Sequence, residues 1–596
     1  MVIFVGGACS RQDQQQRAEM KVLVDIAVRH KLPLPPDDAQ LVLAHTESWS
    51  DGDVGIYSPA FLLEIKSDGT AAILRGCKHE DVSVPDESSW RRFPAEGVEP
   101  APGGYAVEFD RLSTFVCAVQ VAARGDTATA INLWKRFAPS DHCVMSDGDT
   151  ISPKNEKSSV LLARCIFDDL RQNILKRPED WEDLQGRLHA LLDEFPELKT
   201  PARLALLADL QATVKAEPAT PDSTEDLLLQ WSRAPSSLRH LGLYHEYEEA
   251  AADVPARAIV MKGFEAIPDL IRLVDDCRIT VHEDTLGTGR RPAHIRRVGE
   301  LAEQLLRELT GDAANAGVEN KSAAWREWWE SAQTASPEEF FTAAIFRRDG
   351  DTIDGINESP ARIVAERYPH RLIQLCDQLL ESGSDQHSFD LSEVIAASRL
   401  PKQTRVELLV RFANVGSLDD RRCVLQDLAK VDSAEAARLL MPLLERLPQD
   451  STEPYWTCPE AAFVHAVMQI DDDAIWREWH RLARRATVGL RMEMLNPLDY
   501  AYIGEKNRSR RLAILAAFLN DDSERRMSAD PDKFEGPCAA FTFPQIEVRN
   551  YVAMQIASIL EIPARPRERW TAARWADFRN TVQLRLAEED LPEIGD

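Results

Sequence analysis

The sequence has no CxxC pair, although it contains ten cysteines. Two cysteines at that spacing are typical of zinc sites and thioredoxin-like redox sites, so the usual pattern of either is missing. It also lacks a run of about 18 apolar residues, the length that a transmembrane helix needs. Cys376 and Cys423 lie in apolar helical patterns, where a thiol behaves as a small hydrophobic group. We expect buried free cysteines, no metal or other cofactor, and no membrane-spanning helix.

Motifs for phosphate binding and nucleophilic catalysis are also missing. There is no P-loop and no G-x-S-x-G, and the Gly-x-Gly at 287–289 has no third glycine. Histidines stand beside acidic residues in the segments 78–81, 141–143, 245–249 and 281–284, but none forms H-E-x-x-H. We interpret these four clusters as helix-end electrostatics and assign no catalytic or metal-binding residue. An enzyme whose catalytic groups meet only in the fold is the alternative.

The net charge of −28 comes from 98 acidic and 70 basic residues. This balance repels phosphate backbones and excludes non-specific nucleic-acid binding by the chain as a whole. Two short basic runs, 287–297 and 507–512, are interpreted as solvated helix ends. The acidic balance favours a basic protein partner.

The N-terminal residues 1–20 have two interpretations. A Gly-Gly-Ala-Cys tetrapeptide and a Gln-rich stretch follow a short apolar segment, as at the end of a bacterial lipoprotein signal with Cys9 as the lipidated residue. No basic segment precedes it, and the apolar part is shorter than about 7 residues. The other interpretation is a disordered N-terminus before a helix. The chain is then cytoplasmic, whereas acylation of Cys9 would anchor it to the membrane of the bacterial envelope.

Residues 21–110 are predicted to form a small α+β region. Short aliphatic and β-branched runs between 40 and 110 are separated by Gly, Pro, Asp and Ser. Ser67-Asp68-Gly69 lies between two such runs and predicts a β-hairpin.

Helical periodicity begins at Arg111, and residues 111–214 are predicted to form helical hairpins. The first is divided at Gly125-Asp126, so that Leu112 and Phe115 on one half face Ile131 and Trp134 on the other. This pair resembles a tetratricopeptide-type hairpin. A Pro- and Ala-rich linker at 215–224 follows.

Residues 225–596 carry a second resemblance. The stretch 262–280 has a glycine, an Ala-Ile-Pro entry, an aliphatic stripe and an Asp-Asp exit, and it resembles the second helix of a HEAT-type repeat. Two further helices share one apolar spacing, with Leu301, Ala302, Leu305 and Leu309 in one and Val552, Ala553, Ile556 and Leu560 in the other. Trp-Arg-Glu-Trp occurs at both 325–328 and 476–479. These recurrences predict an irregular HEAT-like α-solenoid.

The tryptophan stripes have two readings, since Trp rings on one helix face either stack ligands or fill a core. Polar residues occupy the intervening positions, which favours core packing. The sequence as a whole predicts a mainly α protein with a small N-terminal β-containing region. The resemblance to HEAT-type proteins implies a non-catalytic scaffold for protein–protein interaction. The alternative is an enzyme with its site on the concave face of the solenoid or in the N-terminal region.

Overall fold

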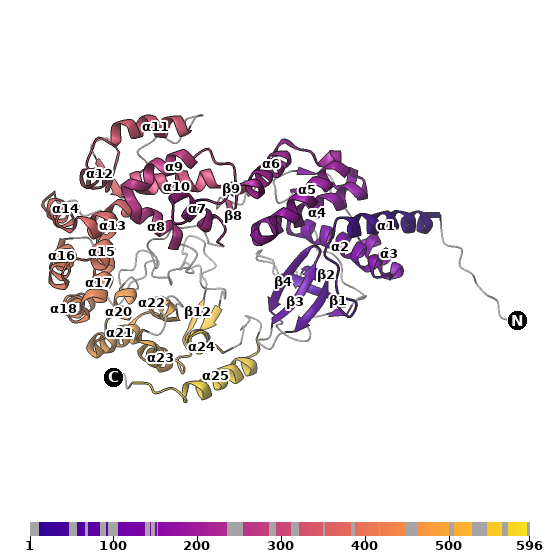
Figure 1. Cartoon of the computed structure of the whole chain (residues 1–596). Coiled ribbons are helices and arrows are strands. Elements are labelled where there is room, and N and C mark those ends of the chain that lie inside the picture. The colour runs from indigo at the N-terminus through magenta and orange to yellow at the C-terminus, as the bar shows by residue number, and fades with distance from the viewer. Residues whose placement is uncertain are drawn as a thin grey trace. The chain divides into compact units, whose positions relative to one another are not determined.

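The computed structural model describes most of the chain, namely residues 11–46, 56–65, 70–83, 91–92, 105–136, 143–144, 150–151, 153–234, 254–284, 294–311, 321–349, 352–382, 388–415, 418–446, 463–499, 506–526, 545–562 and 570–592. They fall into two compact units (Figure 1). The first lies within Met1–Leu238 and Leu273–Ala302, and the second within Arg239–Arg272 and Glu303–Asp596. The predicted Cys9 site lies outside the described residues.

The described residues are mainly helical, with a small antiparallel sheet near the N-terminus, which confirms the predicted fold class. The first unit contains α1 (Arg11–Arg29), β1 (Gln40–Thr46), β2 (Ile56–Ile65), β3 (Thr70–Arg75), β4 (Lys78–Ser83), β5 (Arg91–Arg92), α2 (Tyr105–Ala123), α3 (Thr127–Arg136), β6 (Cys143–Val144), β7 (Thr150–Ile151), α4 (Ser158–Lys176), α5 (Trp181–Glu194), α6 (Pro201–Lys215), α7 (Thr224–Ser232), β8 (Ile279–Asp284) and β9 (His294–Arg297).

The sheet has the strand order β4-β3-β2-β1-β5, with neighbours antiparallel. β2 and β3 flank the predicted turn at 67–69 and pair with each other, which confirms the hairpin. Successive side chains of a strand point to opposite faces. Phe61 and Leu74 therefore lie on one face and join the core of the helices, whereas Ala60 and Ile73 form a small cluster on the other.

The hairpin of α2 and α3 turns where the sequence predicts it. Gly125 has a φ of +90°, which L-residues with side chains rarely adopt. The rings of Phe115 and Trp134 meet edge to face with centroids 5.4 Å apart. Both helices contribute to a core shared with α1, α4, α5 and α6, which joins most of the helices of this unit.

The segment 273–302, which the sequence analysis places in the predicted solenoid, packs instead with the first unit. Ile279 at the start of β8 is 2% exposed and belongs to the same core as α4 and α5. The sequence could not predict this assignment, because a short apolar run does not show whether its residues form a strand or a helix, nor which core they join.

The second unit contains α8 (Val254–Lys262), the 3-10 helix η6 (Gly263–Ala266), α11 (Lys321–Ala332), α12 (Pro337–Ala344), β10 (Phe346–Asp349), β11 (Thr352–Ile356), α13 (Glu358–Arg367), α14 (Pro369–Ser382), α15 (Ser388–Ala397), α16 (Lys402–Val415), α17 (Leu418–Val431), α18 (Ser433–Leu444), α20 (Val464–Gln469), α21 (Asp473–Arg485), α22 (Val488–Leu495), η9 (Asn496–Asp499), α23 (Arg508–Ala517), β12 (Glu524–Arg526), β13 (Gln545–Glu547), α24 (Val548–Ile559) and α25 (Ala572–Leu586). Helices α9 (Ile267–Leu273) and α10 (Val298–Thr310) each continue from one unit into the other.

In the described part of the predicted solenoid, the helices are interrupted by three short β-hairpins, β8–β9, β10–β11 and β12–β13, which were not predicted from the sequence. Each follows a helix and leads directly into another, α10, α13 or α24. The strands are three to six residues long, which is too short for alternation of apolar and polar residues to be recognised. The continuous HEAT-like solenoid therefore stays a prediction.

Candidate functional site

Helices α13 to α21 of the second unit pack in pairs. The first helices, α13, α15, α17 and α20, each pack on the next, and each also packs on its partner, α14, α16, α18 or α21. Figure 1 shows α13, α15 and α17 in one row and α14, α16 and α18 in a second row beside it. We call the described residues from α12 to α21 the helix stack.

The two rows differ in burial. On α15, Leu391, Val394 and Ile395 are at most 1% exposed. On α16, the polar residues Gln403, Glu407, Arg411 and Asn414 are exposed and follow helical spacing. The first row thus forms the interior, while the second row presents a polar face.

Polar contacts between neighbouring layers recur at similar sequence separations. Arg371 Nε on α14 donates to Glu338 on α12 at 2.6 Å, 33 residues away. Arg411 on α16 donates to Asp377 on α14 at 2.7 Å, 34 residues away. The buried Ser392 on α15 bonds to a residue 35 positions later on α17. The starts of α13, α15 and α17 are 30 residues apart, and α20 starts 46 residues after α17, so two layers of about the length of a one-hairpin repeat are followed by a longer one.

The contact of Ser392 is a structural clamp. Its hydroxyl donates to Asp427 Oδ2 at 2.5 Å, and Lys430 donates to Asp427 Oδ1 at 2.7 Å. Ser392 is 0% exposed and Asp427 is 6% exposed, so a substrate has no access to the hydroxyl. The three groups satisfy one another inside the stack, as buried polar side chains must.

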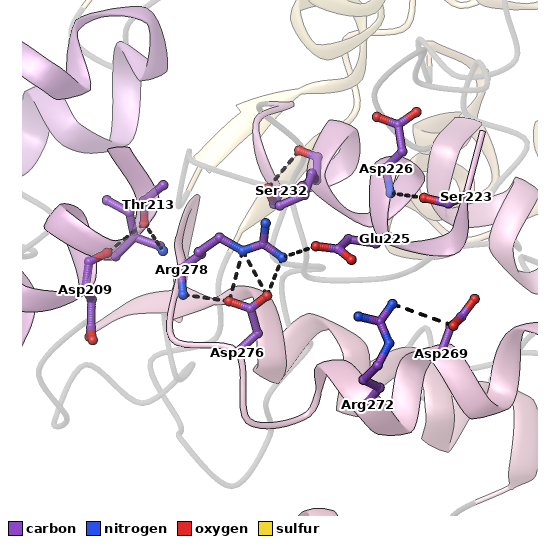
Figure 2. A network of polar contacts seen from close by, with 12 residues as sticks. Asp209, Thr213, Ser223, Glu225, Asp226, Ser232, Asp269, Arg272, Asp276 and Arg278 are labelled. Carbon is purple, nitrogen blue, oxygen red and sulfur yellow. Dashed lines mark hydrogen bonds and ion pairs between the residues drawn. The ribbon is translucent and has the colours of Figure 1, made fainter. Parts of the chain in front are cut away.

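In the first unit, a second polar network holds the chain at the start of the hairpin β8–β9 (Figure 2). The guanidinium of Arg278 lies between two carboxylates, donating to both oxygens of Asp276 and, at 2.8 Å, to Glu225 of α7. Burial by itself disfavours the guanidinium charge, but the hydrogen bonds that Arg278 donates to these carboxylates outweigh it, and the pKa of Arg278 is raised. Nε and Nη2 of Arg278 are both engaged by carboxylates, so these two groups hold the arginine against α7 and the turn before β8.

An aspartate that accepts two backbone amides precedes both the hairpin β8–β9 and the hairpin β12–β13. Asp276 accepts the amide of Arg278 on its side chain and the amide of Gly299 on its carbonyl. Asp521 likewise accepts the amides of Ser523 and Arg549. In both segments, the aspartate before the hairpin binds the first turn of the helix that follows the hairpin. The two segments therefore form an internal structural repeat.

One buried carboxyl titrates near neutrality. Asp169 on α4 is 7% exposed, and burial raises its pKa to about 6 although the charge of Arg187 and a hydrogen bond from Asn173 act in the opposite direction. Arg187 donates instead to the carbonyls of His30 and Lys31 at the end of α1. Asp169 has no second acid or base positioned for catalysis among the groups that shift its pKa.

The tryptophans mostly fill the core, as predicted. Trp476, Trp479 and Trp325 are at most 2% exposed, and Trp476 Nε1 donates to the Ile470 carbonyl. Trp328 and Trp329 are half-buried.

The predicted basic run at 507–512 is paired with acids. Arg508 binds Glu589, Arg510 binds Asp471 and Asp473, and Arg511 donates to a backbone carbonyl. The run lies at the start of α23, a helix end as predicted, but Arg511 is 2% exposed, so the run is not fully solvated. Of the run at 287–297, only 294–297 is described, and Arg297 pairs with Asp209.

Two of the four histidine clusters lie in described strands. The segments 78–81 and 281–284 are on strands β4 and β8 and not at helix ends, so that part of the interpretation is wrong. Both segments pair with a neighbouring strand, and the strand at β8 was not predicted from the sequence. The cluster at 245–249 lies outside the described residues, as do 141 and 142. Among described side chains, no three His, Cys, Asp or Glu groups converge as a metal site.

The prediction of buried free cysteines is confirmed in part, since Cys117, Cys165 and Cys376 are buried and Cys277 is exposed. Cys376 is fully buried, and burial raises the pKa of its thiol to about 12. Cys423 is half-buried. Over the described helices, none is long and apolar enough to cross a membrane.

Comparisons with known proteins found no matching family model, no similar curated protein and no similar solved structure.

Proposed function

We propose that the chain is a non-catalytic scaffold for protein–protein interaction, built on the helix stack of the second unit. The observation that supports this most is the recurrence of interlayer contacts at about 30 to 35 residues. Stacked hairpins of this kind give an extended surface, because each layer adds one more exposed helix face. The HEAT-like description of the stack is part of the proposal.

The proposed partner is a basic protein. The net charge of −28 accelerates encounter with a basic surface at low salt. The acidity does not lie on the second row, since α14, α16, α18 and α21 together carry nine Lys or Arg and six Asp or Glu residues. A basic segment is therefore expected to bind elsewhere on the unit, and the second row is expected to contact neutral or acidic parts of the partner.

Affinity capture with the full chain tests the proposal. The tagged protein is incubated with extract of its native cell at about 50 and 300 mM salt, and each retained protein is purified and titrated back. A binding partner should associate directly, more weakly at the higher salt because exposed charges are screened. The control is an unrelated acidic protein of similar net charge on the same resin. A chain that retains nothing beyond this control at either salt contradicts the scaffold function.

A further inference from the structure

Four half-buried aromatic rings in the second unit form a closed circuit. Phe264 of η6 contacts Trp329 of α11 with ring centroids 4.8 Å apart, and Trp329 contacts Trp328 at 6.0 Å. Trp328 contacts Phe340 of α12 at 6.0 Å, and Phe340 returns to Phe264 at 5.3 Å. All four retain solvent exposure. We call these four residues the aromatic circuit.

Buried rings hold the circuit in place from beneath. Trp325 is 2% exposed and meets Trp328 edge to face at 5.4 Å, and Phe341 is 0% exposed and meets Phe340 at 5.1 Å. Gly263, with φ +64°, admits the Phe341 ring, since a β-carbon there would lie 3.3 Å from Phe341 Cζ. The outer rings are thus fixed by packing without being covered by it.

The elements that carry the circuit are acidic. η6, α11 and α12 together hold five carboxylates and two cationic side chains, which distinguishes them from the second row of the stack. Of the two cations, Lys321 pairs with Glu303 at 2.6 Å. Glu338 pairs with Arg371 at 2.6 Å, which lowers its pKa and also balances its charge locally, so the acidity of these elements rests on the other four carboxylates.

We propose that the aromatic circuit binds a cationic side chain, the ammonium or guanidinium group of a basic segment in the protein partner. This inference rests on the proposed function and names the place of contact. The face of an aromatic ring is negative, and a cation within about 6 Å of the centroid is attracted to it. Several fixed rings need no reorganisation to receive the cation, and the surrounding carboxylates add to the attraction.

A small cation tests the circuit without knowledge of the partner. The full chain is labelled with 5-fluorotryptophan, and Trp328→Phe and Trp329→Phe assign their ¹⁹F signals. Tetramethylammonium chloride should shift these two signals in a saturable way. Equal concentrations of sodium chloride, and of tert-butanol as an uncharged molecule of similar shape, should not. The signal of the buried Trp476, assigned with Trp476→Phe, is the internal control.

Side-chain replacement provides the second readout. Trp329→Leu keeps an apolar group and should weaken tetramethylammonium binding at least about 3-fold, the loss expected for one exposed cation–π contact. Equal shifts with tert-butanol, or no saturable shift at all, would overturn the cation site. Capture of a partner whose affinity is unchanged by Trp329→Leu would leave the scaffold function standing and refute only its contact at the circuit.

Discussion

Gly299 lies so close to Val274 that a β-carbon at this position would be 2.3 Å from the Val274 carbonyl oxygen. The amide of Gly299 donates to the Asp276 carbonyl at 3.0 Å, so the first turn of α10 is pressed against the chain before the hairpin. Only a residue without a side chain fits between them.

Replacement of Gly299 by alanine is therefore expected to lower the free energy of unfolding by about 2–3 kcal/mol, because the backbone must shift to relieve the overlap. The matched control is Gly186→Ala in α5, where a β-carbon meets nothing within 4 Å. That change should raise stability by about 0.5–1 kcal/mol, since alanine favours the helix. Urea unfolding of both variants measures the difference. Equal effects of the two substitutions would contradict the close approach.

Asp427→Ala should destabilise the second unit by about 3 kcal/mol, because Lys430 and Ser392 lose their shared buried partner. Ser392→Ala removes one hydrogen bond and should cost about 1 kcal/mol. Arg438→Ala is the control, since its pair with Glu435 is exposed and such pairs contribute less than about 1 kcal/mol. Denaturant unfolding monitored by tryptophan fluorescence gives the three values. If Asp427→Ala lowers the free energy of unfolding by no more than Arg438→Ala does, the buried contact of Asp427 with Ser392 and Lys430 does not stabilise the unit.

Asp169 should make stability fall as pH rises. The pKa of its carboxyl is about 6 in the folded chain against 3.8 for an unperturbed aspartate, so the native state retains a proton that the unfolded state has released. Stability is then lost between about pH 4 and pH 6, by on the order of 3 kcal/mol for roughly two pH units. Asp169→Asn should abolish this loss and leave the variant more stable than the native chain at pH 7. A pH profile of unfolding that is the same for both proteins would refute the assignment.

The amide of Ile279 donates to Thr213 Oγ1 at 2.8 Å, within the buried contact of α6 and β8. Thr213→Val keeps the shape but leaves this amide without its acceptor, which should cost about 1–2 kcal/mol. The control is Thr581→Val in α25, whose hydroxyl is bonded within its own helix at an exposed position and whose loss should matter little. Hydrogen exchange at Ile279 should be faster in the first variant only. Unchanged protection would show that the threonine does not hold the strand.

Helix existence could be predicted from sequence because apolar residues at helical spacing must be buried. The six apolar positions of α10 from 298 to 309 are all 0% exposed, and the predicted Gly311 ends the helix with φ +67°. The tryptophan stripe at 476 was interpreted correctly for the same reason, whereas in the stripe at 325 only Trp325 is buried, and Trp328 and Trp329 are half-buried.

The hairpin anchors could not be predicted, because they depend on pairs of residues that are distant along the chain. Aligning Gly299 with Arg549, whose amides donate to the two aspartates, places Ala302 opposite Val552, whereas the apolar spacing places it opposite Ala553, one residue away. Nothing in Asp276 or Asp521 alone distinguishes an anchor from a loop aspartate. The aromatic circuit was missed in part because Phe264 and Phe340 come from elements separate from the tryptophan helix.

The most direct test of the scaffold function is hydrogen exchange of the full chain with and without a purified partner. We expect slower exchange in the second unit on binding. The largest effect is expected at residues 321–344, which carry most of the aromatic circuit and the start of the helix stack. Exchange that stays unchanged throughout the second unit at saturating partner, or that slows only in the first unit, would contradict it.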